Sequence, residues 1–554
     1  MTFTTTQGEE ISYIEYYEKK YDRKLKYPNQ PLLIYKRKNL AEIHLIPELC
    51  VLTGQTPEMR QNFQLQKELS FLIKPGPSHK LESMKGLINS LESNTRSKEL
   101  LKEWDISFSK SPLKVESLQI DAGNLLMGNN VQFPLHSTSD LDRKIQNKML
   151  KQPELKRVGI FFSKRDQGAA TNFKETLKEC TDTFSYPMDP PRLFPIDWKD
   201  FNDWETVFQK NLNPSVQAVI LLLPGKKKSG VFYDECKKYF LTKCPIPSQV
   251  VLASTITAGK NLRSIVNKVL IQLCAKVGGT PWSITNIPFT EKPTMIIGID
   301  SFHKSMMKNK SILAYCATMD RNFSKYWSSV QEYSSYEDLG KAFQTMVENS
   351  MLAFQETNKP VFPQRIIVYR DGVTESMRRA VHEIEIKAFL KAFQNLKENN
   401  EMQTMPDFIF INVNKASSTK FFSEDRARGG LSNPPPGTAV ASEITDGNDF
   451  YLISQKILNG SANPTHYSIL KYMENVGGEY LDKTNLVSED LMNKLLAATY
   501  KFCYLYYNFS GAIKVPAPLQ YANKLGSLVG ERWKPNDVMI PDPGFQKIKS
   551  LYFI

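Results

Sequence analysis

The stretch TMIIGIDSFH, residues 294–303, and the stretch RIIVYRDG, residues 365–372, decide the fold of this chain. Each holds a run of β-branched and aromatic residues that is too short for a helix and predicts a buried strand. Each run ends on an aspartate, Asp300 and Asp371, and a buried carboxylate is costly unless a cation meets it. The two strands together predict a carboxylate pair that can hold a divalent metal against a phosphodiester. For either aspartate alone, the alternative is that it caps its strand or opens a turn.

The length and charge of the chain set its broad class. Its 554 residues exceed one ordinary core and predict roughly three to four domains. A hydrophobic content of 41% with 11% aromatic residues is typical of a packed globular protein. The 71 Lys and Arg residues against 58 Asp and Glu residues leave a net charge of +13. This excess is consistent with a polyanionic partner, most commonly a nucleic acid.

The cysteines and the apolar runs bear on the compartment. Seven scattered cysteines form no CxxC pair, which disfavours a zinc site or a disulfide framework and is typical of a reducing compartment. The first residues, MTFTTTQGEE, have no apolar signal core, and the apolar stretch Ala218–Leu223 is too short to span a bilayer. We therefore expect a cytoplasmic or nuclear protein that is not secreted and has no membrane partner.

Strand-like and helix-like segments alternate from about Arg157 onward. VGIFF (158–162) and QAVILLLPG (217–225) predict buried parallel strands, and residues 234–241 and 261–277 predict amphipathic helices. This alternation favours an α/β fold with an open sheet. The basic turn from Gly225 to Gly230 lacks the spacing of a P-loop and predicts a solvated loop.

Further elements lie on either side of that region. Downstream, residues 311–319, 407–413 and 449–454 predict strands, and residues 374–396 predict a long helix. Upstream, Thr56-Pro57-Glu58 predicts a helix start, with the helix running to about Ile73, and residues 79–104 predict a second helix. Residues 1–40 are dense in Tyr and Lys and are typical of the second half of a domain.

Five motifs, in this order, resemble the Piwi clade of the Argonaute family: GIDSFH, RIIVYRDGV, LSNPPPGT, PTHYSIL and VPAPLQYANKL. The segment at 45–63 is similar to the Piwi linker, and residues 2–17 are similar to the later part of a PAZ domain. The resemblance covers nearly the whole chain. It implies a C-terminal part of PAZ at 1–40, a helical linker at 41–150, a Rossmann-like MID domain at 151–285 and a ribonuclease H-like PIWI domain at 286–554. It also implies that the N-terminal domain and the first half of PAZ are absent.

The resemblance implies cleavage of RNA directed by a guide, with Mg²⁺ or Mn²⁺ as cofactor. Asp300 and Asp371 match the two catalytic aspartates, and His466 of PTHY matches the third metal ligand. A lone histidine is otherwise more often a core or surface residue. The fourth acid of the family falls on Asp338, which is one methylene shorter than the usual glutamate. For Asp338 the alternative is a capping-box helix start with Ser335, in which an acid answers the helix dipole.

A second set matches the pocket for the 5′-phosphate of the guide. Two of its members, Tyr233 and Lys237, are four residues apart and share one face of a helix. The resemblance implies a phosphate held by ammonium and amide groups, with the first base stacked on an aromatic ring. Gln272 and the C-terminal carboxylate of Ile554 match a version with a metal ion at the phosphate. For each residue alone, a solvated helix face is the alternative. The matching residues are Tyr233, Lys237, Gln249, Gln272, Lys276 and Lys524.

Three functions stay open from the sequence. The first is an endoribonuclease that binds a single-stranded, piRNA-like guide and cuts complementary RNA in gene or transposon silencing, as a monomer. The second is a guide-dependent platform that binds target RNA without cleaving it and recruits silencing-complex proteins. The third is a ribonuclease H-like transposase or integrase, which would need a late carboxylate where this chain has PTHY.

Overall fold

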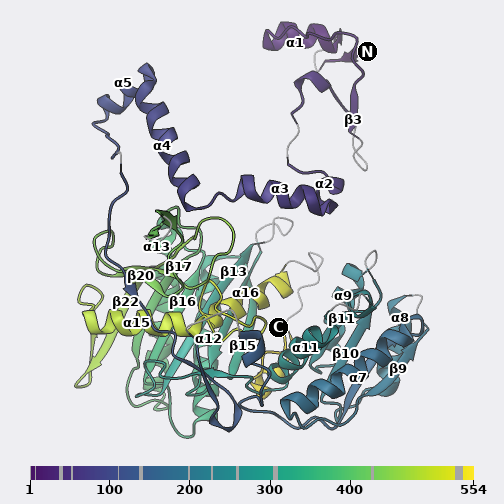
Figure 1. The fold of residues 1–554 in the computed structure, drawn as a ribbon. Helices are drawn as coiled ribbons and strands as arrows, with labels where there is room; N and C mark the ends of the chain where they lie inside the picture. Colours follow the sequence, from purple (N-terminus) through teal and green to yellow (C-terminus); the bar gives the residue numbers. More distant parts are fainter. Residues whose placement is uncertain are drawn as a thin grey trace. The chain divides into compact units, whose positions relative to one another are not determined.

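The computed structural model divides the chain into two compact units, Met1–Lys74 and Pro75–Ile554. Figure 1 shows the ribbon of the chain with its element labels. The structure describes residues 2–5, 8–35, 42–51, 54–109, 111–135, 141–197, 200–225, 229–257, 261–303, 310–425, 429–530 and 541–554.

The first unit consists of short strands and helices. Two antiparallel pairs are β1 (Thr2–Thr4) with β2 (Glu10–Ser12), and β3 (Leu33–Tyr35) with β4 (Ile43–Leu45). The helix predicted from Thr56 to Ile73 is divided at Asn62, because the Asn62 side chain accepts the N–H of Leu65 and begins a new helix. The helical elements are α1 (Tyr13–Tyr21), η1 (Pro47–Leu49), α2 (Pro57–Gln61) and α3 (Phe63–Ile73).

The second unit begins with two solvent-exposed helices. The single helix predicted over 79–104 is in fact two, α4 (Pro77–Ser93) and α5 (Thr95–Glu103). Asn94 ends the first and caps the second by accepting the N–H of Ser97. The following segment adds β5 (Leu118–Gln119), β6 (Asn124–Leu126), η2 (Gly128–Asn130), β7 (Gln132–Pro134) and α6 (Leu141–Lys144).

A four-stranded parallel sheet follows, in the order β11-β10-β8-β9. The predicted strands VGIFF and AVILLL are its two central strands, so the open parallel α/β sheet is confirmed. The helix predicted at 234–241 begins earlier and changes to a π turn at Tyr239. Of the loop predicted at 225–230, residues 226–228 lie outside the described ones, and Ser229 and Gly230 belong to helix α9 instead. The bounds are β8 (Val158–Ser163), η4 (Lys164–Asp166), α7 (Gln167–Phe184), β9 (Arg192–Ile196), α8 (Phe201–Asn211), β10 (Ala218–Leu223), α9 (Ser229–Lys238), η5 (Tyr239–Lys243), β11 (Ser248–Leu252), α10 (Ala253–Thr257) and α11 (Leu262–Lys276).

A ten-stranded mixed sheet forms the centre of the second unit. Its order is β15-β14-β13-β16-β17-β22-β21-β20-β5, with β23 added to β22. The two opening stretches form the predicted strands, β13 (Thr294–His303) and β16 (Arg365–Asp371), and these are parallel neighbours. The other strands of this sheet are β14 (Ser311–Thr318), β15 (Tyr326–Tyr333), β17 (Asp407–Asn414), β20 (Thr438–Val440), β21 (Asp449–Ile453), β22 (Thr465–Val476) and β23 (Glu479–Asp482). Outside it, β12 (Ser283–Ile284) pairs with β6, and β18 (Ser423–Asp425) pairs with β19 (Gly430–Ser432).

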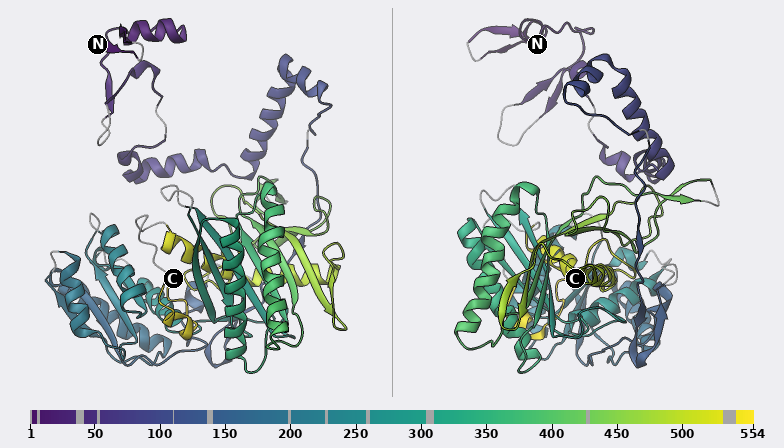
Figure 2. Two further views of the ribbon diagram at one scale, coloured as in Figure 1. Left: turned by 180° about the vertical axis from the view of Figure 1, so that it is seen from behind. Right: turned by 90° about the vertical axis from the view of Figure 1, so that its left-hand side faces the viewer.

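Helices cover both faces of this sheet, as Figure 2 shows. One face packs against α12 (Tyr336–Thr357) and a second long helix, and the other packs against α15 (Glu489–Phe502) and α16 (Ala517–Gly530). The second long helix was predicted at 374–396, and it contains a π turn. The parts of this second helix are η6 (Glu375–Met377), α13 (Arg378–Ala380), η7 (Val381–Ile386) and α14 (Lys387–Glu398). The last helix of the chain is α17 (Gly544–Ile548).

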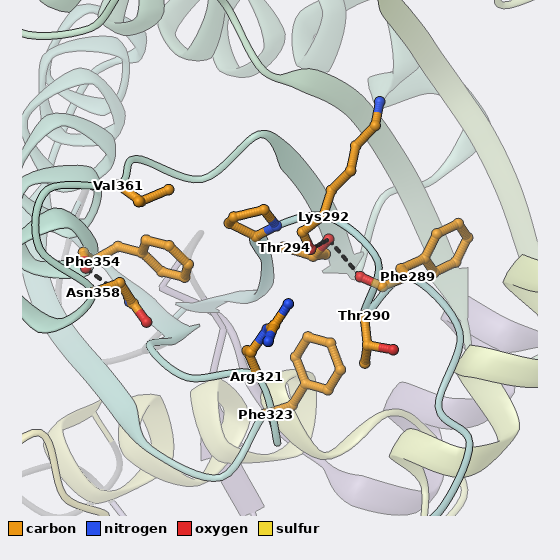
Figure 3. Close-up of a pocket in the computed structure, with 10 residues that line it drawn as sticks. Phe289, Thr290, Lys292, Thr294, Arg321, Phe323, Phe354, Asn358 and Val361 are labelled. Atoms are coloured by element: carbon orange, nitrogen blue, oxygen red, sulfur yellow. Dashed lines mark hydrogen bonds between the residues drawn. The ribbon is translucent and has the colours of Figure 1, made fainter.

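A small cavity of about 220 Å³ lies at the start of β13 (Figure 3). Phe289, Lys292, Arg321 and Asn358 are among the residues that line it. Thr294, also in the lining, is six residues before Asp300, or ~20 Å along a strand. The cavity is therefore remote from the aspartate. Among the described residues, no helix is long and apolar enough to cross a membrane.

Candidate functional site

Asp300 and Asp371 lie side by side at the ends of two parallel strands. The register pairs Ile299 with Arg370, so the next residue on each strand is the aspartate. Side chains alternate along a strand, which places both carboxylates on the face that carries Ile296 and Tyr369. Asp371 is only 7% exposed. The predicted carboxylate pair is therefore present in the structure.

The surroundings of the pair partly offset its negative charge. Burial raises the pKa of Asp300, a hydrogen bond from Asn523 opposes this, and the charge of Asp371 raises the pKa further. The amide nitrogen of Asn523 donates to Oδ2 of Asp300 at 2.7 Å. The ammonium of Lys415 forms an ion pair with Asp371. Each carboxylate thus has a partner within the protein.

The sequence reasoning missed Asn523, although this residue lies in the quoted motif VPAPLQYANKL. It is carried by α16, which crosses β13 closely at Gly298, where a Cβ atom would overlap the backbone of Pro518. The neighbouring Tyr521, Ala522 and Leu525 are all buried. The sequence signal for Asn523 was a polar residue among apolar ones, because a buried polar group needs a hydrogen-bond partner.

The structure does not bring His466 together with the two aspartates. Tyr467 belongs to the same core face as Tyr369, so its neighbour His466 points to the opposite face of the sheet. There Nε2 of His466 lies 2.5 Å from Oδ2 of Asp449. The imidazole also stacks on Tyr451, with 4.3 Å between ring centroids.

Asp338 occupies the first turn of α12 and is exposed. Its N–H donates to Oγ of Ser335 at 3.1 Å, and its carboxylate accepts a hydrogen bond from the hydroxyl group of Ser334 at 2.9 Å. The hydrogen bond from Ser334 lowers the pKa of Asp338. This is the helix-start geometry that the sequence left open as the alternative. Within the described part of the chain, no three His, Cys, Asp or Glu side chains form a metal-binding group.

The donor set at the carboxylate pair fits a magnesium or manganese ion. Mg²⁺ is commonly held by one or two carboxylates while substrate phosphates and water complete its shell. Asp300 and Asp371 supply two oxygen donors on one face of adjacent strands. They are the residues that would hold the ion.

The predicted phosphate-binding residues meet around Ser248, at the start of β11. The ammonium of Lys237 donates to the carbonyl oxygen of Ser248 at 2.9 Å and to its hydroxyl at 3.2 Å. The ammonium of Lys276 donates to the same carbonyl at 2.8 Å. Lys237 also lies over the ring of Tyr233, 5.9 Å from the centroid. One carbonyl oxygen therefore holds two lysines together.

Positive charge is concentrated in this lysine pocket, which we define as Lys237, Lys276 and Lys524 with the residues around them. Lys276 is 1% exposed and Lys237 is 4% exposed. Burial lowers the pKa of Lys276 well below its usual range, and repulsion from Lys237 and Lys524 lowers it further. Lys524 comes from α16, so the pocket combines residues of the small parallel sheet and of the large sheet's covering helix.

Two amides and the end of the chain complete the pocket. Nε2 of Gln249 donates to Oε1 of Gln272 at 2.8 Å, while Oε1 of Gln249 is buried without a hydrogen-bond partner among the described residues. The N–H of Leu551 donates to the carbonyl of Ala275 at 3.3 Å, which brings the C-terminal segment to the end of α11. Ile554 itself is buried in the same core. All six predicted phosphate-binding residues are thus in one region.

Comparisons with known proteins identify the family of the chain. The Piwi domain model matches residues 218–534, and the PAZ domain model matches residues 1–71. Piwi-like protein 1 of Gallus gallus is 32% identical over 539 residues, covering 96% of this chain and 59% of that protein. Piwi-like protein Siwi of Bombyx mori is 31% identical and covers 99% of this chain and 59% of its own. The chain thus spans about three fifths of the length of these curated relatives.

Solved structures give the same result. The crystal structure of Drosophila Piwi matches 100% of this chain and 70% of its own, with a TM-score of 0.76 and 28% identity. Kluyveromyces polysporus Argonaute with a guide RNA has a TM-score of 0.71 over 98% of this chain and 64% of its own, with 18% identity. The predicted combination of a Rossmann-like and a ribonuclease H-like α/β domain is confirmed. The chain belongs to the Piwi clade of the Argonaute family.

Proposed function

We propose that this chain is a small-RNA-guided RNA-binding protein that holds the 5′-phosphate of its guide in the lysine pocket. The observation that carries the proposal is that two buried lysines, Lys237 and Lys276, donate to one carbonyl oxygen, with the charge of Lys524 close enough to lower the pKa of Lys276. A terminal phosphate would supply the negative charge that this group of cations attracts. One of the matched structures is an Argonaute with a guide RNA.

Each pocket residue has a defined task in this proposal. The ammonium groups bind phosphate oxygens, and the ring of Tyr233 accepts the first base by stacking. The amides of Gln249 and Gln272 fix the orientation of the terminal nucleotide. Gln272 and the carboxylate of Ile554 would hold a metal ion at the phosphate.

A further group of lysines supports a strand of RNA passing beside the carboxylate pair. Lys514 donates to the carbonyl of Lys415 at 2.5 Å. Burial lowers the pKa of Lys514, and the charges of Lys420 and Lys415 lower it further. Lysines placed together in this way bind a phosphate backbone without reading its sequence, which leaves recognition to base pairing with the guide.

The direct test compares RNA with a 5′-phosphate and RNA with a 5′-hydroxyl in fluorescence anisotropy. The full chain is expected to prefer the phosphorylated RNA, and Lys276→Met is expected to remove most of that preference. Lys268→Met is the matched control, because Lys268 is an exposed lysine on the same helix α11. Equal affinity of the unaltered chain for both RNAs would contradict the proposal.

Cleavage of complementary RNA is the second candidate function, favoured by the adjacent carboxylates of Asp300 and Asp371. A bound Mg²⁺ or Mn²⁺ ion would activate water and stabilise the leaving 3′-oxygen. The chain's own contribution is to hold the two carboxylates on one face and to support Asp300 through Asn523. The catalytic roles of His466 and Asp338 stay predictions.

One assay separates cutting from binding alone. The chain is loaded with a 5′-phosphorylated guide, and a labelled complementary RNA is added with Mg²⁺. A single cut that Asp300→Ala abolishes supports the endonuclease. Loss of cutting in the separate variants His466→Ala or Asp338→Ala would support a catalytic role for those residues. Tight binding without a cut supports a silencing platform that acts through recruited proteins in RNA-mediated silencing.

A further inference from the structure

Arg370 lies behind the carboxylate pair, on the opposite face of the sheet, and is 3% exposed. Its guanidinium makes a two-point contact with Glu385, from Nε to Oε2 at 2.8 Å and from Nη2 to Oε1 at 3.0 Å. Nη2 also donates to Oγ of Ser301 at 3.0 Å, and Nη1 donates to the backbone carbonyl of Asp371. The guanidinium therefore joins the residue after Asp300 to Asp371 itself.

The partner Glu385 reaches Arg370 because of a local change in helix geometry. It lies in the π turn Val381–Ile386, where Val381, Glu385 and Ile386 are all buried. A π turn inserts one residue into an α-helix and is frequent at functional sites. A regular helix would follow a different register here. The turn thus directs a carboxylate toward the back of the sheet.

We propose that Arg370 and Glu385 are positioning residues that fix the spacing of the Asp300 and Asp371 carboxylates, so that the two can share a divalent cation. The proposal rests on the second candidate function, in which these aspartates hold the metal. The planar guanidinium group suits this task. Its Nε and Nη2 bind Glu385 along one edge, and its N–H donors also reach Ser301 on one strand and Asp371 on the other. Partners of this kind, outside the metal ligands, commonly tune metal affinity.

Packing alone does not hold this pair in place. A cavity of about 250 Å³ adjoins Arg370 and Glu385 and is lined also by Tyr333, Met377 and Ile384. The guanidinium can therefore move into this space when Glu385 is lost. A buried ion pair also contributes little net stability compared with well-packed apolar residues. We therefore expect the ion pair between Arg370 and Glu385 to affect the geometry of the strand ends more than the stability of the fold.

The same strand offers a matched control at its other end. Arg365 begins β16 and lies 3.5 Å from the buried Asp407, while its own side chain is 13% exposed and also pairs with Glu291. Asp407 is 5% exposed and also binds Lys292 at 3.0 Å. Asp407→Asn thus perturbs a comparable pair about six residues, or ~20 Å, from Asp371. Any loss that follows from general destabilisation is shared by both variants.

The experiment compares the full chain with Glu385→Gln and Asp407→Asn by two measurements. The first is Mn²⁺ affinity without guide, from electron paramagnetic resonance. We expect Glu385→Gln to weaken it by roughly 10–100-fold and Asp407→Asn to leave it within twofold. The second is hydrogen exchange by mass spectrometry. Exchange should rise in peptides that contain Ser301 and Asp371 for Glu385→Gln, and in peptides that contain Thr294 and Arg365 for Asp407→Asn.

Two more variants keep the result decisive if Glu385→Gln folds poorly. Arg370→Lys keeps the charge but loses the fork, and Ser301→Ala removes one contact, so both should shift exchange at the same two strand ends. Unchanged exchange there, or Mn²⁺ affinity equal to that of the unaltered chain, would overturn the proposal. If the unaltered chain binds no Mn²⁺, the cleavage function fails, while the exchange pattern still decides whether Arg370 and Glu385 fix the strand ends.

Discussion

The lysine pocket and the carboxylate pair are opposite solutions to holding like charges together. In the lysine pocket, Lys276 donates to the neutral carbonyl of Ser248 and is repelled by Lys237 and Lys524. In the carboxylate pair, Asp300 accepts from Asn523, and Asp371 is paired with Lys415. The first region is thus arranged for an anion from outside. The second already has partners, which a metal ion would have to rearrange.

One helix connects the two regions. Asn523 and Lys524 are consecutive residues of α16, and they face Asp300 and the lysine pocket respectively. The charged contacts of the two regions are otherwise separate. Substitutions of charged residues should therefore affect one region, whereas displacement of α16 should affect both.

The largest effect is expected for loss of a carboxylate. Asp371→Ala should reduce guided cleavage of complementary RNA roughly 1,000-fold or more, since metal-held charge contributes several kcal/mol to the transition state. Guide affinity should stay within twofold. Single-turnover cleavage and anisotropy measure the two quantities. A parallel loss of guide affinity would show that the regions are not separable.

Displacing α16 is the next largest change. In Gly298→Ala the added methyl group overlaps the backbone of Pro518, so α16 must shift away from β13. We expect a loss of about 3 kcal/mol in the free energy of unfolding, as for other overpacked sites. Both Mn²⁺ affinity and the preference for a 5′-phosphate should fall. A fall in only one of them would disprove the shared role of α16. Gly340→Ala is the control, because a Cβ there would meet the side chain of Ile384 at 3.6 Å, an ordinary van der Waals contact.

Removing the amide at Asp300 should have a smaller effect. Asn523→Leu deletes a hydrogen bond to a buried carboxylate, which is worth about 1.5–3 kcal/mol when the carboxylate is charged. The bond lowers the pKa of Asp300, so the folded chain loses this stability as Asp300 becomes protonated at low pH. Urea unfolding at pH 7.5 and pH 5 should show a smaller difference between the variant and the unaltered chain at pH 5. A difference that stays constant between pH 7.5 and pH 5 would contradict the expected link between this hydrogen bond and the charge of Asp300.

The smallest effect concerns the pH dependence of stability at the lysine pocket. Folding lowers the pKa of Lys276, so the unfolded chain binds more protons up to the usual value near 10.5. Stability from this group therefore rises with pH over that range. In Lys276→Met the rise in urea midpoint from pH 7.5 to pH 9.5 should be smaller, while Lys268→Met should leave it unchanged. An unaltered slope in Lys276→Met would contradict a lowered pKa of Lys276 in the folded chain.

The sequence predicted the elements that depend on local pattern. The runs before Asp300 and Asp371 are continuous and apolar, and they form adjacent strands. The spacing of Tyr233 and Lys237 predicted that they share one helix face, and Lys237 does lie over the ring of Tyr233. Helix interruptions at Asn62 and at Tyr239 were missed, because capping and π turns depend on single residues and on packing.

The carboxylate site was predicted only in part, because its third member depends on tertiary contact. Asn523 reaches Asp300 because α16 crosses β13 at Gly298, which no local pattern encodes. In PTHYSIL, the apolar positions Tyr467 and Ile469 placed His466 on the other face of its strand. The sequence could not tell which face also carries the aspartates.

The central claim is that the lysine pocket binds the 5′-phosphate of a guide RNA. The most direct test is the ratio of affinities for 5′-phosphorylated and 5′-hydroxyl forms of one RNA, measured for the unaltered chain, Lys276→Met and Lys268→Met. We predict a ratio of roughly 10 or more for the unaltered chain and for Lys268→Met, falling to near 1 in Lys276→Met. A ratio near 1 in the unaltered chain, or one that Lys276→Met leaves unchanged, would contradict the claim.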